Sequence, residues 1–394
     1  MLSGQIKSPC IGPAQKLHRL RVTVAVAFVC SLGLCWRLWI SSRLFPLSPV
    51  TAMLPSIPTP VDVIWFCLLL GLLAAIIIVP SRWLILIFLV LAGLLSLWDQ
   101  MRWQPWFFIY FFILAAIGFS MWTKSESRKQ SALDACRLII ASTYVWSGLQ
   151  KLNVNFIRET WPDMSGPLLR LLPQALNRLP PYWVLVIPLL EISIGLGLIT
   201  RKFRKQTVLL AIGTHTFVLA LLVSSRENTV VWPWNIAMAL FVVILFWQDK
   251  QNGPLQILAP RSALHALIIV LFGVMPAFSF ADLWDSYLSS ALYSGNADQS
   301  VIYVSRSVAG QLPAAIQPHI WQAKEPFFLD VNRWAYAELN VPVYPEPRIY
   351  RRVAAQICAT PGSFPGEILL RIRKKPNLFT GLRKSEFYDC EHLM

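Results

Sequence analysis

Two ionisable side chains stand inside otherwise apolar stretches of the sequence, where they could carry out chemistry. Glu191 lies in the apolar run 183–199 and His215 in the run 206–224. Each is at a similar distance from the end of its run that would face the outer side of the membrane. An ionisable group at bilayer depth costs about 2.5–3.5 kcal/mol to insert, so such a residue is a functional candidate. On antiparallel neighbouring helices the two side chains would lie at nearly one depth. We therefore predict that Glu191 and His215 pair directly.

A histidine–carboxylate pair in a low dielectric has several chemical uses. It can relay a proton, ligate a metal or hold a quinone oxygen, and it can equally serve as a structural hydrogen bond between helices. The sequence leaves the functional and the structural interpretations open. One histidine and one glutamate are too few ligands for a metal, and the sequence offers no third ligand at helical spacing. We therefore predict no metal site.

Two further polar residues mark the ends of apolar runs. Lys151 ends the run 133–152, where a lysine commonly extends its amine to the membrane surface. In a desolvated pocket the same amine can lose its proton and act as a base. Asn235 lies near the start of the run 229–247, and we predict that its amide donates a hydrogen bond to another helix or contacts a bound cofactor. Asp134 and Arg137, one helical turn apart, should neutralise each other.

The elements that must position these residues are membrane-spanning helices. Hydrophobic residues make up 56% of the chain and charged residues 14%, against about 25% charged residues in an ordinary soluble domain. A helix needs about 20 mainly apolar residues to cross roughly 30 Å of hydrocarbon. Runs of this kind occupy 22–40, 61–79, 82–98, 104–122, 133–152, 183–199, 206–224, 229–247 and 263–281. The sequence thus predicts an all-α polytopic membrane bundle of about nine transmembrane helices.

Positive charge predicts the orientation of this bundle. If the runs alternate, the basic residues of the short loops all fall on one side: Lys16, Arg19, Arg21, Arg82, Lys124, Arg128, Lys129 and the cluster Arg201, Lys202, Arg204 and Lys205. Cytoplasmic loops carry an excess of lysine and arginine, so we expect an N-terminus in the cytoplasm and a C-terminal domain outside it. The other side receives 46–60, 98–100, 153–181 and 226–228, whose charge is sparser and mixed. We expect a bacterial inner membrane, with the first run kept as a signal anchor. If the polar run 133–152 does not cross, the later helices invert.

The composition of the chain changes near Asp285, after which apolar residues become less frequent. Alternating segments at 301–304 and 367–373 predict strands, and 334–339 and 350–358 predict short helices. Three prolines exclude regular structure from 340–348. We predict a small extracytoplasmic α+β domain over 285–394, which holds neither a Gly-rich phosphate loop nor a trustworthy catalytic triad. Before it, 283–296 is predicted to be an amphipathic helix on the membrane surface, ending at a Gly-Asn cap.

The domain organisation follows from these boundaries. We expect a cytoplasmic tail over 1–21, the first four transmembrane helices over 22–132, a four-helix unit over 133–250, and a linker with the last helix over 251–284. Because the C-terminal domain is placed in an oxidising compartment, Cys358 and Cys390 can form a disulfide, the alternative being two unpaired thiols. The cysteines of the apolar runs are small packing residues: Cys30, Cys35, Cys67 and Cys136.

Part of the chain, about 137–247, resembles the four-helix membrane unit of the DoxX-like superfamily. This superfamily includes the MauE proteins and the HTTM proteins, which are related to vitamin K-dependent gamma-carboxylase. This part covers about a quarter of the chain, and within it the likeness rests on four segments: Ser147-Gly148-Leu149-Gln150-Lys151-Leu152-Asn153, the stretch 190–199, the basic turn 201–205 and the run with His215.

The resemblance implies two kinds of activity. The carboxylase relatives imply Lys151 as the base for vitamin K hydroquinone chemistry and a role for His215. Two departures weaken that likeness, since Gln150 replaces the first of two expected lysines and Val218 stands where an asparagine is expected. The DoxX and MauE relatives imply quinone-linked or thiol-redox membrane complexes.

Three functional hypotheses follow, and they leave open whether the chain is an enzyme. The first is a redox-associated membrane protein that binds a quinone-like or lipid molecule beside Glu191, His215 and Lys151. The second is a carboxylase-like enzyme with Lys151 as base, and the third is a non-catalytic structural or assembly factor. The expected partners are the lipid bilayer and a membrane redox or assembly protein. Nucleic acid is not expected despite a net charge of +15, because the basic residues form short clusters between apolar runs.

Overall fold

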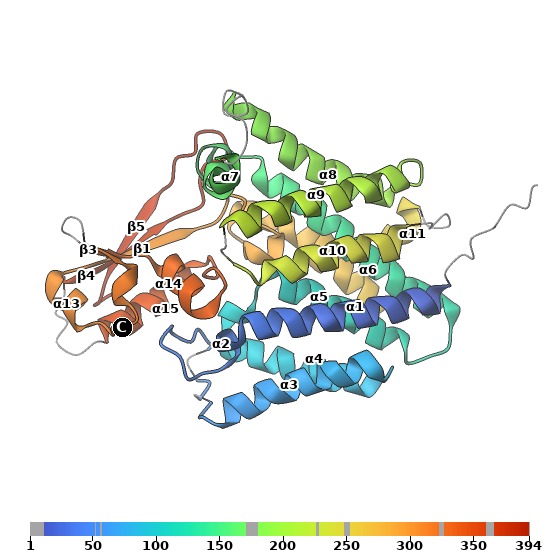
Figure 1. Cartoon of the computed structure of the whole chain (residues 1–394), viewed down its shortest axis with the longest axis horizontal. Coiled ribbons are helices and arrows are strands. Elements are labelled where there is room, and N and C mark those ends of the chain that lie inside the picture. The colour runs from blue at the N-terminus through green and yellow to red at the C-terminus, as the bar shows by residue number, and fades with distance from the viewer. Residues whose placement is uncertain are drawn as a thin grey trace, which may run out of the picture.

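The chain folds into a bundle of long helices with a smaller α+β domain at one end (Figure 1). The computed structural model describes residues 12–51, 53–55, 57–170, 180–225, 228–247, 253–322, 327–359 and 366–393. Parts of the predicted outer loops, 171–179 and 226–227, lie outside the described residues.

Five helical segments are long and apolar enough to cross a membrane. They are α1 (Pro13–Leu34), α3 (Val61–Ile78), η4 with α8 (Pro181–Ile199), α9 (Arg204–Ser225) and the segment Ala263–Ala281, which joins α12 (Ala263–Ile268), η5 (Ile269–Val274) and η6 (Met275–Ala281). Shorter apolar helices are α4 (Arg82–Trp98), α5 (Pro105–Ser120) and α10 (Val231–Phe246). Proline begins α1 and α5, where its missing N–H costs no helical hydrogen bond.

The polar helix α6 (Glu126–Lys151) extends along the inside of the bundle. Near its start, the hydroxyl of Ser131 lies 3.2 Å from that of Ser262, and near its end Gln150 donates to Ser279 at 2.7 Å. The helix therefore covers the same distance as the apolar segment Ala263–Ala281. Asp134 and Arg137 pair at 2.7 Å, as predicted, and both are buried. The polar side chains of α6 thus face protein and not lipid. They lower the hydropathy of the helix, so hydropathy alone ranks it low as a membrane-spanning candidate.

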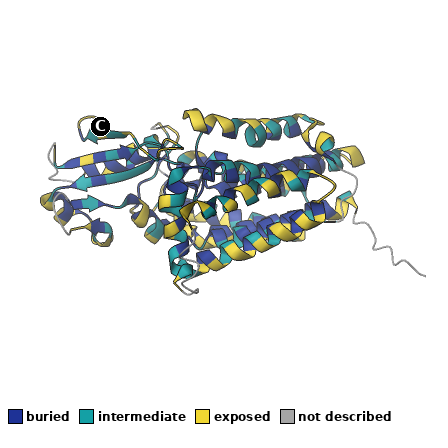
Figure 2. Ribbon diagram, turned by 90° about the horizontal axis from the view of Figure 1, so that it is seen from above, coloured by how far each residue is buried: buried dark blue, intermediate teal, exposed yellow. Residues whose placement is uncertain are grey.

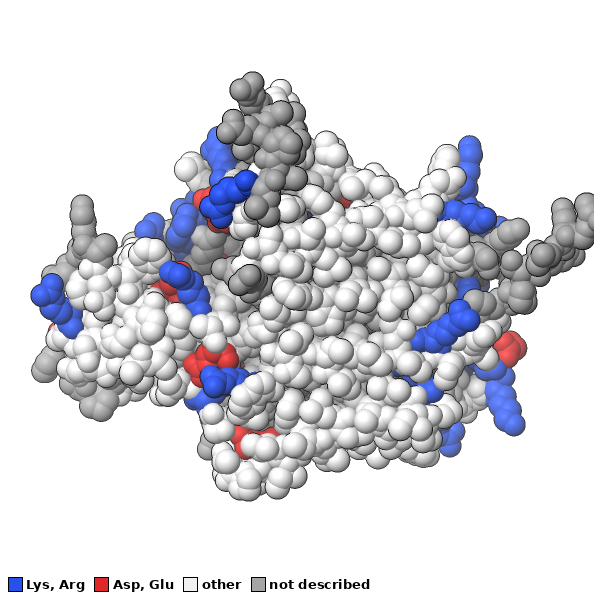
Figure 3. All heavy atoms as spheres, viewed as in Figure 1, with Lys and Arg blue, Asp and Glu red and all other residues white. Residues whose placement is uncertain are grey.

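The surface of the bundle is suited to lipid. Large apolar side chains project outward from several helices, for example Ile64 at 62% and Leu209 at 58% exposure. Figure 2 shows exposed residues on the outward faces of the helices and buried residues between them. In Figure 3 a broad uncharged band separates basic residues at the far end of the bundle from mixed charges beside the domain.

The first helix differs from its predicted position. Helix α1 begins at Pro13 and ends at Leu34, so most of the described part of the predicted tail 1–21 is helical, and the end of the run 22–40 forms the separate short helix α2 (Trp36–Trp39). The physical reason lies in Arg21. Its side chain is buried and donates to the carbonyl of Ile76 on α3, so this basic residue belongs to the packed bundle.

The C-terminal domain contains an antiparallel sheet of five strands in the order β2-β3-β1-β4-β5. The strands are β1 (Gln299–Val304), β2 (Ile320–Trp321), β3 (Phe327–Leu329), β4 (Ile368–Arg373) and β5 (Ser385–Asp389). The central strand β1 pairs Ile302 with both Leu329 and Leu370, and all three side chains are buried on one face. These residues form the core beneath helices α14 (Val331–Leu339) and α15 (Pro347–Cys358).

The predicted elements of this domain are confirmed, with two boundary changes. Helix α14 begins at Val331 because the side chain of Asp330 caps it, and α15 begins at Pro347, inside the stretch predicted to be irregular. Proline suits the first turn of a helix, so it starts α15 here. Cys358 at the end of α15 and Cys390 after β5 form a disulfide.

The prediction of a surface helix over 283–296 is wrong. This segment is a series of turns with the short η7 (Tyr287–Ser289), and it is packed between the bundle and the domain. The backbone N–H of Ser286 donates to Glu346 at 2.8 Å, which ties the segment to the domain. Tyr293 and Gly295 have positive φ angles, and a helix cannot continue through such residues.

The remaining helical turns connect these elements. They are η1 (Gln100–Arg102), η2 (Phe156–Thr160), α7 (Trp161–Leu169), α11 (Pro254–Leu258), α13 (Arg306–Gln311) and η8 (Gln317–His319). Helix α7 lies across the domain end of the bundle, beside α9 (Figure 1). It therefore covers the place where the predicted site residues come together.

Candidate functional site

The lysine and the glutamate of the predicted site form an ion pair. Lys151, in the last turn of α6, donates from Nζ to Oε2 of Glu191 on α8 at 2.8 Å. The hydroxyl of Ser147, one turn earlier on α6, accepts a second hydrogen bond from the same amine. The two charged side chains are only 10% and 12% exposed. A buried ammonium is thus matched by one carboxylate and one hydroxyl.

Two glycines bring these charges together. A Cβ on Gly148 would lie 2.5 Å from the carbonyl oxygen of Pro188, and one on Gly195 would lie 2.7 Å from that of Ala141. Real Cβ atoms do not approach so closely, so α6 and α8 touch backbone to backbone. Small residues allow this kind of close approach between helices in membranes. The glycines therefore set the distance that the Lys151–Glu191 pair spans.

The predicted direct pairing of Glu191 with His215 is wrong. His215, on α9, instead lies between two neutral partners: its Nε2 is 2.5 Å from the hydroxyl of Tyr144, and its Nδ1 is 2.9 Å from Oδ1 of Asn235. The physical reason is that α6 packs closely against α8, and Lys151 at the end of α6 offers Glu191 a full positive charge. An opposite charge is a stronger partner for a carboxylate than a neutral imidazole.

The hydrogen bonds define the protonation of this chain of residues. The amide nitrogen of Asn235 donates to the carbonyl of Val231 at 2.8 Å, so its oxygen is left to accept from Nδ1 of His215. In a neutral imidazole Nε2 is then the acceptor, and the Tyr144 hydroxyl donates to it. Asn235 does link two helices, but as an acceptor, whereas the sequence predicted a donor.

All four predicted site residues in the bundle line one cavity of about 120 Å³. Lys151 and Glu191 lie on its wall with His215 and Asn235, and most of the remaining lining is apolar, for example Val218 and Met238. An apolar cavity of about 150 Å³ is large enough to hold a benzene ring. This cavity, which we call the bundle cavity, is somewhat smaller and therefore has room for at most one small ring or a short stretch of chain.

Sequence reasoning missed Tyr144 as a site residue. Tyr144 precedes Lys151 by seven residues on α6, and this spacing returns a helix to the same face. Tyr144 and His215 are far apart along the chain, so the sequence did not show that their side chains come into contact. The same spacing rule could have included it, had the face of α6 been followed from Lys151 toward the helix start.

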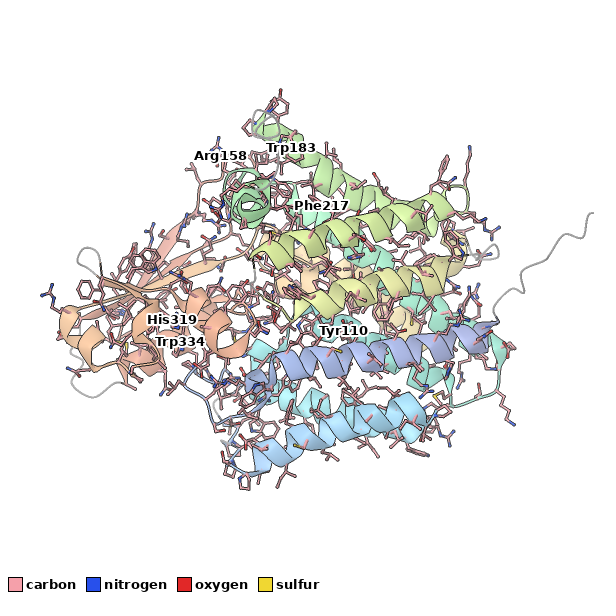
Figure 4. The ribbon with its side chains drawn as sticks, viewed as in Figure 1. Tyr110, Arg158, Trp183, Phe217, His319 and Trp334 are labelled. Atoms are coloured by element: carbon pink, nitrogen blue, oxygen red, sulfur yellow. A yellow bond between two sulfur atoms is a disulfide. The ribbon has the colours of Figure 1, made fainter. Side chains whose placement is uncertain are left out.

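An aromatic cluster closes the bundle beside α7. Trp161 packs against Trp183 of η4 at 5.7 Å and against Phe217 of α9 at 6.4 Å between ring centroids. Figure 4 labels Trp183 and Phe217, which both lie beside α7 on the side of the bundle. Met164, also on α7, lines the bundle cavity. Helix α7 thus forms part of the cavity wall on the side of the domain.

Within the described residues, no group of three or more histidine, cysteine, aspartate or glutamate side chains could hold a metal ion. Comparison of the chain with protein-family models, with curated proteins and with solved structures found no match. The likeness to DoxX-like proteins therefore remains a prediction from the quoted residues, and the function must be argued from the site.

Proposed function

We propose that this chain is an integral membrane protein that binds a quinone-like or lipid molecule in the bundle cavity. The observation that carries the proposal is the convergence of Lys151, Glu191, His215 and Asn235 on one largely apolar cavity. Binding sites for small molecules are typically apolar cavities with a few convergent polar groups. The size of the cavity favours a single ring with oxygen substituents.

The polar wall offers such a ring two kinds of contact. The Lys151 ammonium can donate to an oxygen, and the chain from Tyr144 through His215 to Asn235 can exchange a proton with it. Quinone reduction consumes electrons as well as protons. The redox form of this proposal therefore includes an electron-transferring partner in the membrane.

The same proposal extends to topology. We propose that the helices at all of the predicted runs cross the membrane, with the basic end in the cytoplasm and the α+β domain outside a bacterial inner membrane. The separation of charge in Figure 3 supports this orientation, because lysine and arginine gather at the end opposite the domain. The length of α6 supports a crossing by the polar fifth helix.

The ion pair argues against a carboxylase-like base. The Lys151 amine already donates to Glu191 and Ser147, so in this arrangement it is engaged as a hydrogen-bond donor and not as a base. A base at this position would first have to be released by Glu191.

The non-catalytic alternative is favoured by a specific observation: Lys151 and His215 each have partners on neighbouring helices, as structural hydrogen bonds require.

The test is the content of isoprenoid quinone in the purified protein. Full-length protein is extracted from host membranes in mild detergent, and bound quinone is measured by mass spectrometry. We expect about one molecule per chain in the wild type and at least a tenfold loss in His215→Ala. Thr216→Ala is the matched control, since this exposed neighbour on α9 is not part of the cavity wall.

Two outcomes would contradict the proposal. A well-folded wild type that carries neither isoprenoid quinone nor lipid after mild extraction removes the binding function. Equal ligand content in the wild type and the His215→Ala variant, with only a lower thermal midpoint, favours the structural role.

A further inference from the structure

The bundle cavity adjoins two other cavities that lead into the α+β domain. A middle cavity of about 230 Å³ shares Met164, Leu222 and Tyr293 with it. A junction cavity of about 480 Å³, between the bundle and the domain, shares Tyr293 and Tyr336 with the middle cavity. Tyr293 lines all three, so the cavities form one series from the bundle interior to the domain.

Polarity changes along this series. The bundle cavity is walled mostly by apolar side chains such as Val218 and Met238, with a few polar groups among them. The junction cavity is lined by charged and hydroxyl side chains, among them Asp163, Asp330 and Arg373. A molecule that fits both ends must itself be apolar at one end and polar at the other.

Some charges of the junction cavity already have partners within the protein. Asp298 pairs with Lys374 at 2.9 Å, and Arg383 donates to the backbone carbonyls of Gly295, Ala297 and Lys374. In contrast, the hydroxyl oxygen of Ser300 is buried without a hydrogen-bond partner among the described residues. A buried polar atom of this kind costs free energy unless a ligand or water satisfies it. Ser300 thus adds a hydroxyl group without a partner among the described residues to the wall of the junction cavity.

Tyr293 is held where the cavities meet. Its φ angle is +55°, a conformation that is uncommon for residues other than glycine. Its hydroxyl accepts a hydrogen bond from Asn228, the residue preceding the turn into α10, at 2.6 Å. The hydrogen bond holds the ring where the apolar bundle cavity and the polar junction cavity meet.

We propose that one amphiphile occupies this series, with its apolar part in the bundle cavity and a hydroxyl-rich head group in the junction cavity. The inference rests on the lipid form of the proposed function, in which a lipid and not a quinone ring occupies the bundle cavity, and it names the class of that lipid. The lining mixes carboxylates with arginine and hydroxyl groups, and a hydroxyl can both donate to the former and accept from the latter. A purely anionic head group would face Asp163 and Asp330, and a purely cationic one would face Arg373.

Photo-crosslinking in the membranes of the expression host tests this arrangement, with the host's own amphiphiles as the probe. p-Benzoylphenylalanine replaces Val218 at the bundle end or Tyr336 at the junction end of the full-length chain. After irradiation, the adduct mass is measured on the purified protein. Leu209 on the outer face of α9 reports bulk lipid, and Trp321 on β2 reports background.

We expect the same adduct mass at Val218 and Tyr336, with a hydroxyl-rich head-group fragment, and a different, bulk-lipid pattern at Leu209. Met164→Trp, which fills the contact between two cavities, should lower both adducts at least tenfold. Gly166→Trp is its control on α7, because a Cβ at Gly166 meets open space. Only variants with the thermal midpoint of the wild type are compared.

Each other outcome is decisive. An adduct at Val218 alone leaves the proposed function standing and overturns the amphiphile. Different masses at the two positions overturn the single ligand, and a common adduct without hydroxyls overturns the head-group class. No adduct at Val218, with or without one at Tyr336, removes the proposed function together with this inference.

Discussion

At the scale of residues, the site depends on how buried charges are paired. Lys151 and Glu191 neutralise each other inside the bundle, while His215 is held by neutral groups. The wall of the cavity thus carries a fixed charge pair and a separate chain of neutral hydrogen-bonded groups. A ligand oxygen near both would meet a donor from Lys151 without exposing an unpaired carboxylate.

The charge pair predicts a non-additive effect on stability. Lys151→Met leaves the Glu191 carboxylate buried without a counter-ion, which typically costs about 3–5 kcal/mol. The double variant Lys151→Met/Glu191→Met removes both charges, so its thermal midpoint should lie above that of the single variant. The measurement is thermal unfolding of the full chain in detergent.

A surface pair supplies the matched control for this experiment. Lys129 lies 2.6 Å from Glu126, whose side chain is 67% exposed, and exposed pairs contribute only about 0–1 kcal/mol. Lys129→Met should therefore change the midpoint little. A double variant as unstable as Lys151→Met would show that the pair is not the source of the loss.

At the scale of elements, the close contact of α6 with α8 positions the site. Because Gly148 and Gly195 let the two backbones touch, any side chain there must push the helices apart. The separation would act directly on the Lys151–Glu191 distance of 2.8 Å. The geometry of the charge pair is thus a property of two helices.

We expect Gly148→Ala to destabilise the protein by about 1–3 kcal/mol, the usual cost of overpacking, and to lower ligand content. Gly213→Ala on α9 is the control, since a Cβ there meets open space and alanine favours a helix. Thermal unfolding and quinone extraction measure the two effects. A neutral Gly148→Ala would mean that the backbones separate without cost.

The contact between the domain and segment 283–296 predicts a pH dependence. Burial, followed by the nearby charge of Asp285, raises the pKa of Glu346 above its ordinary value of 4.5. The folded state then binds this proton more tightly than the unfolded state, so stability falls as pH rises from about 4.5 through the raised pKa. Burial also raises the pKa of Asp298, which contributes with the same sign.

Glu346→Gln should reduce this loss of stability, because glutamine stays neutral and can still accept from the N–H of Ser286. Thermal midpoints of the full chain between pH 4 and pH 8 provide the measurement, with the exposed Glu391→Gln as control. An unchanged pH profile in Glu346→Gln would place the dependence elsewhere.

At the scale of the whole molecule, charge and cysteine chemistry agree on one orientation. The charges at the end of the bundle away from the domain are mainly basic, whereas those beside the domain are mixed (Figure 3), and the domain holds the disulfide between Cys358 and Cys390. Disulfides persist mainly in oxidising compartments. Both features are what the proposed topology, with the domain outside the cytoplasm, requires.

Cysteine labelling in intact cells tests this orientation. In a chain with Cys10, Cys30 and Cys67 replaced by alanine, a membrane-impermeant maleimide should label Arg170→Cys after α7 and Phe379→Cys in the domain. Lys124→Cys, which precedes α6, should react only after permeabilisation. Labelling of Lys124→Cys and Arg170→Cys from one side would show that the fifth helix does not cross.

Much of the architecture is readable in the sequence because its signals are local. Apolar runs predicted the helices of the bundle, and the alternation of apolar and polar residues around Ile302 and Leu370 predicted two strands. Both patterns depend on which side chains are removed from water, and this can be seen in a short stretch of sequence. The segment 283–296 had the composition of a surface helix, but a contact with Glu346 from a distant element holds it in turns.

The sequence by itself determined the residue types of the site, the helices that carry them and the paired charges of Asp134 and Arg137, which are neighbours on one helix. Only the tertiary structure decided that Glu191 meets Lys151 and that His215 meets Tyr144. The physical reason is that such partners depend on how helices are rotated and how closely they approach. Glycines on α6 and α8 set that approach, and their effect appears only when the two helices are packed together.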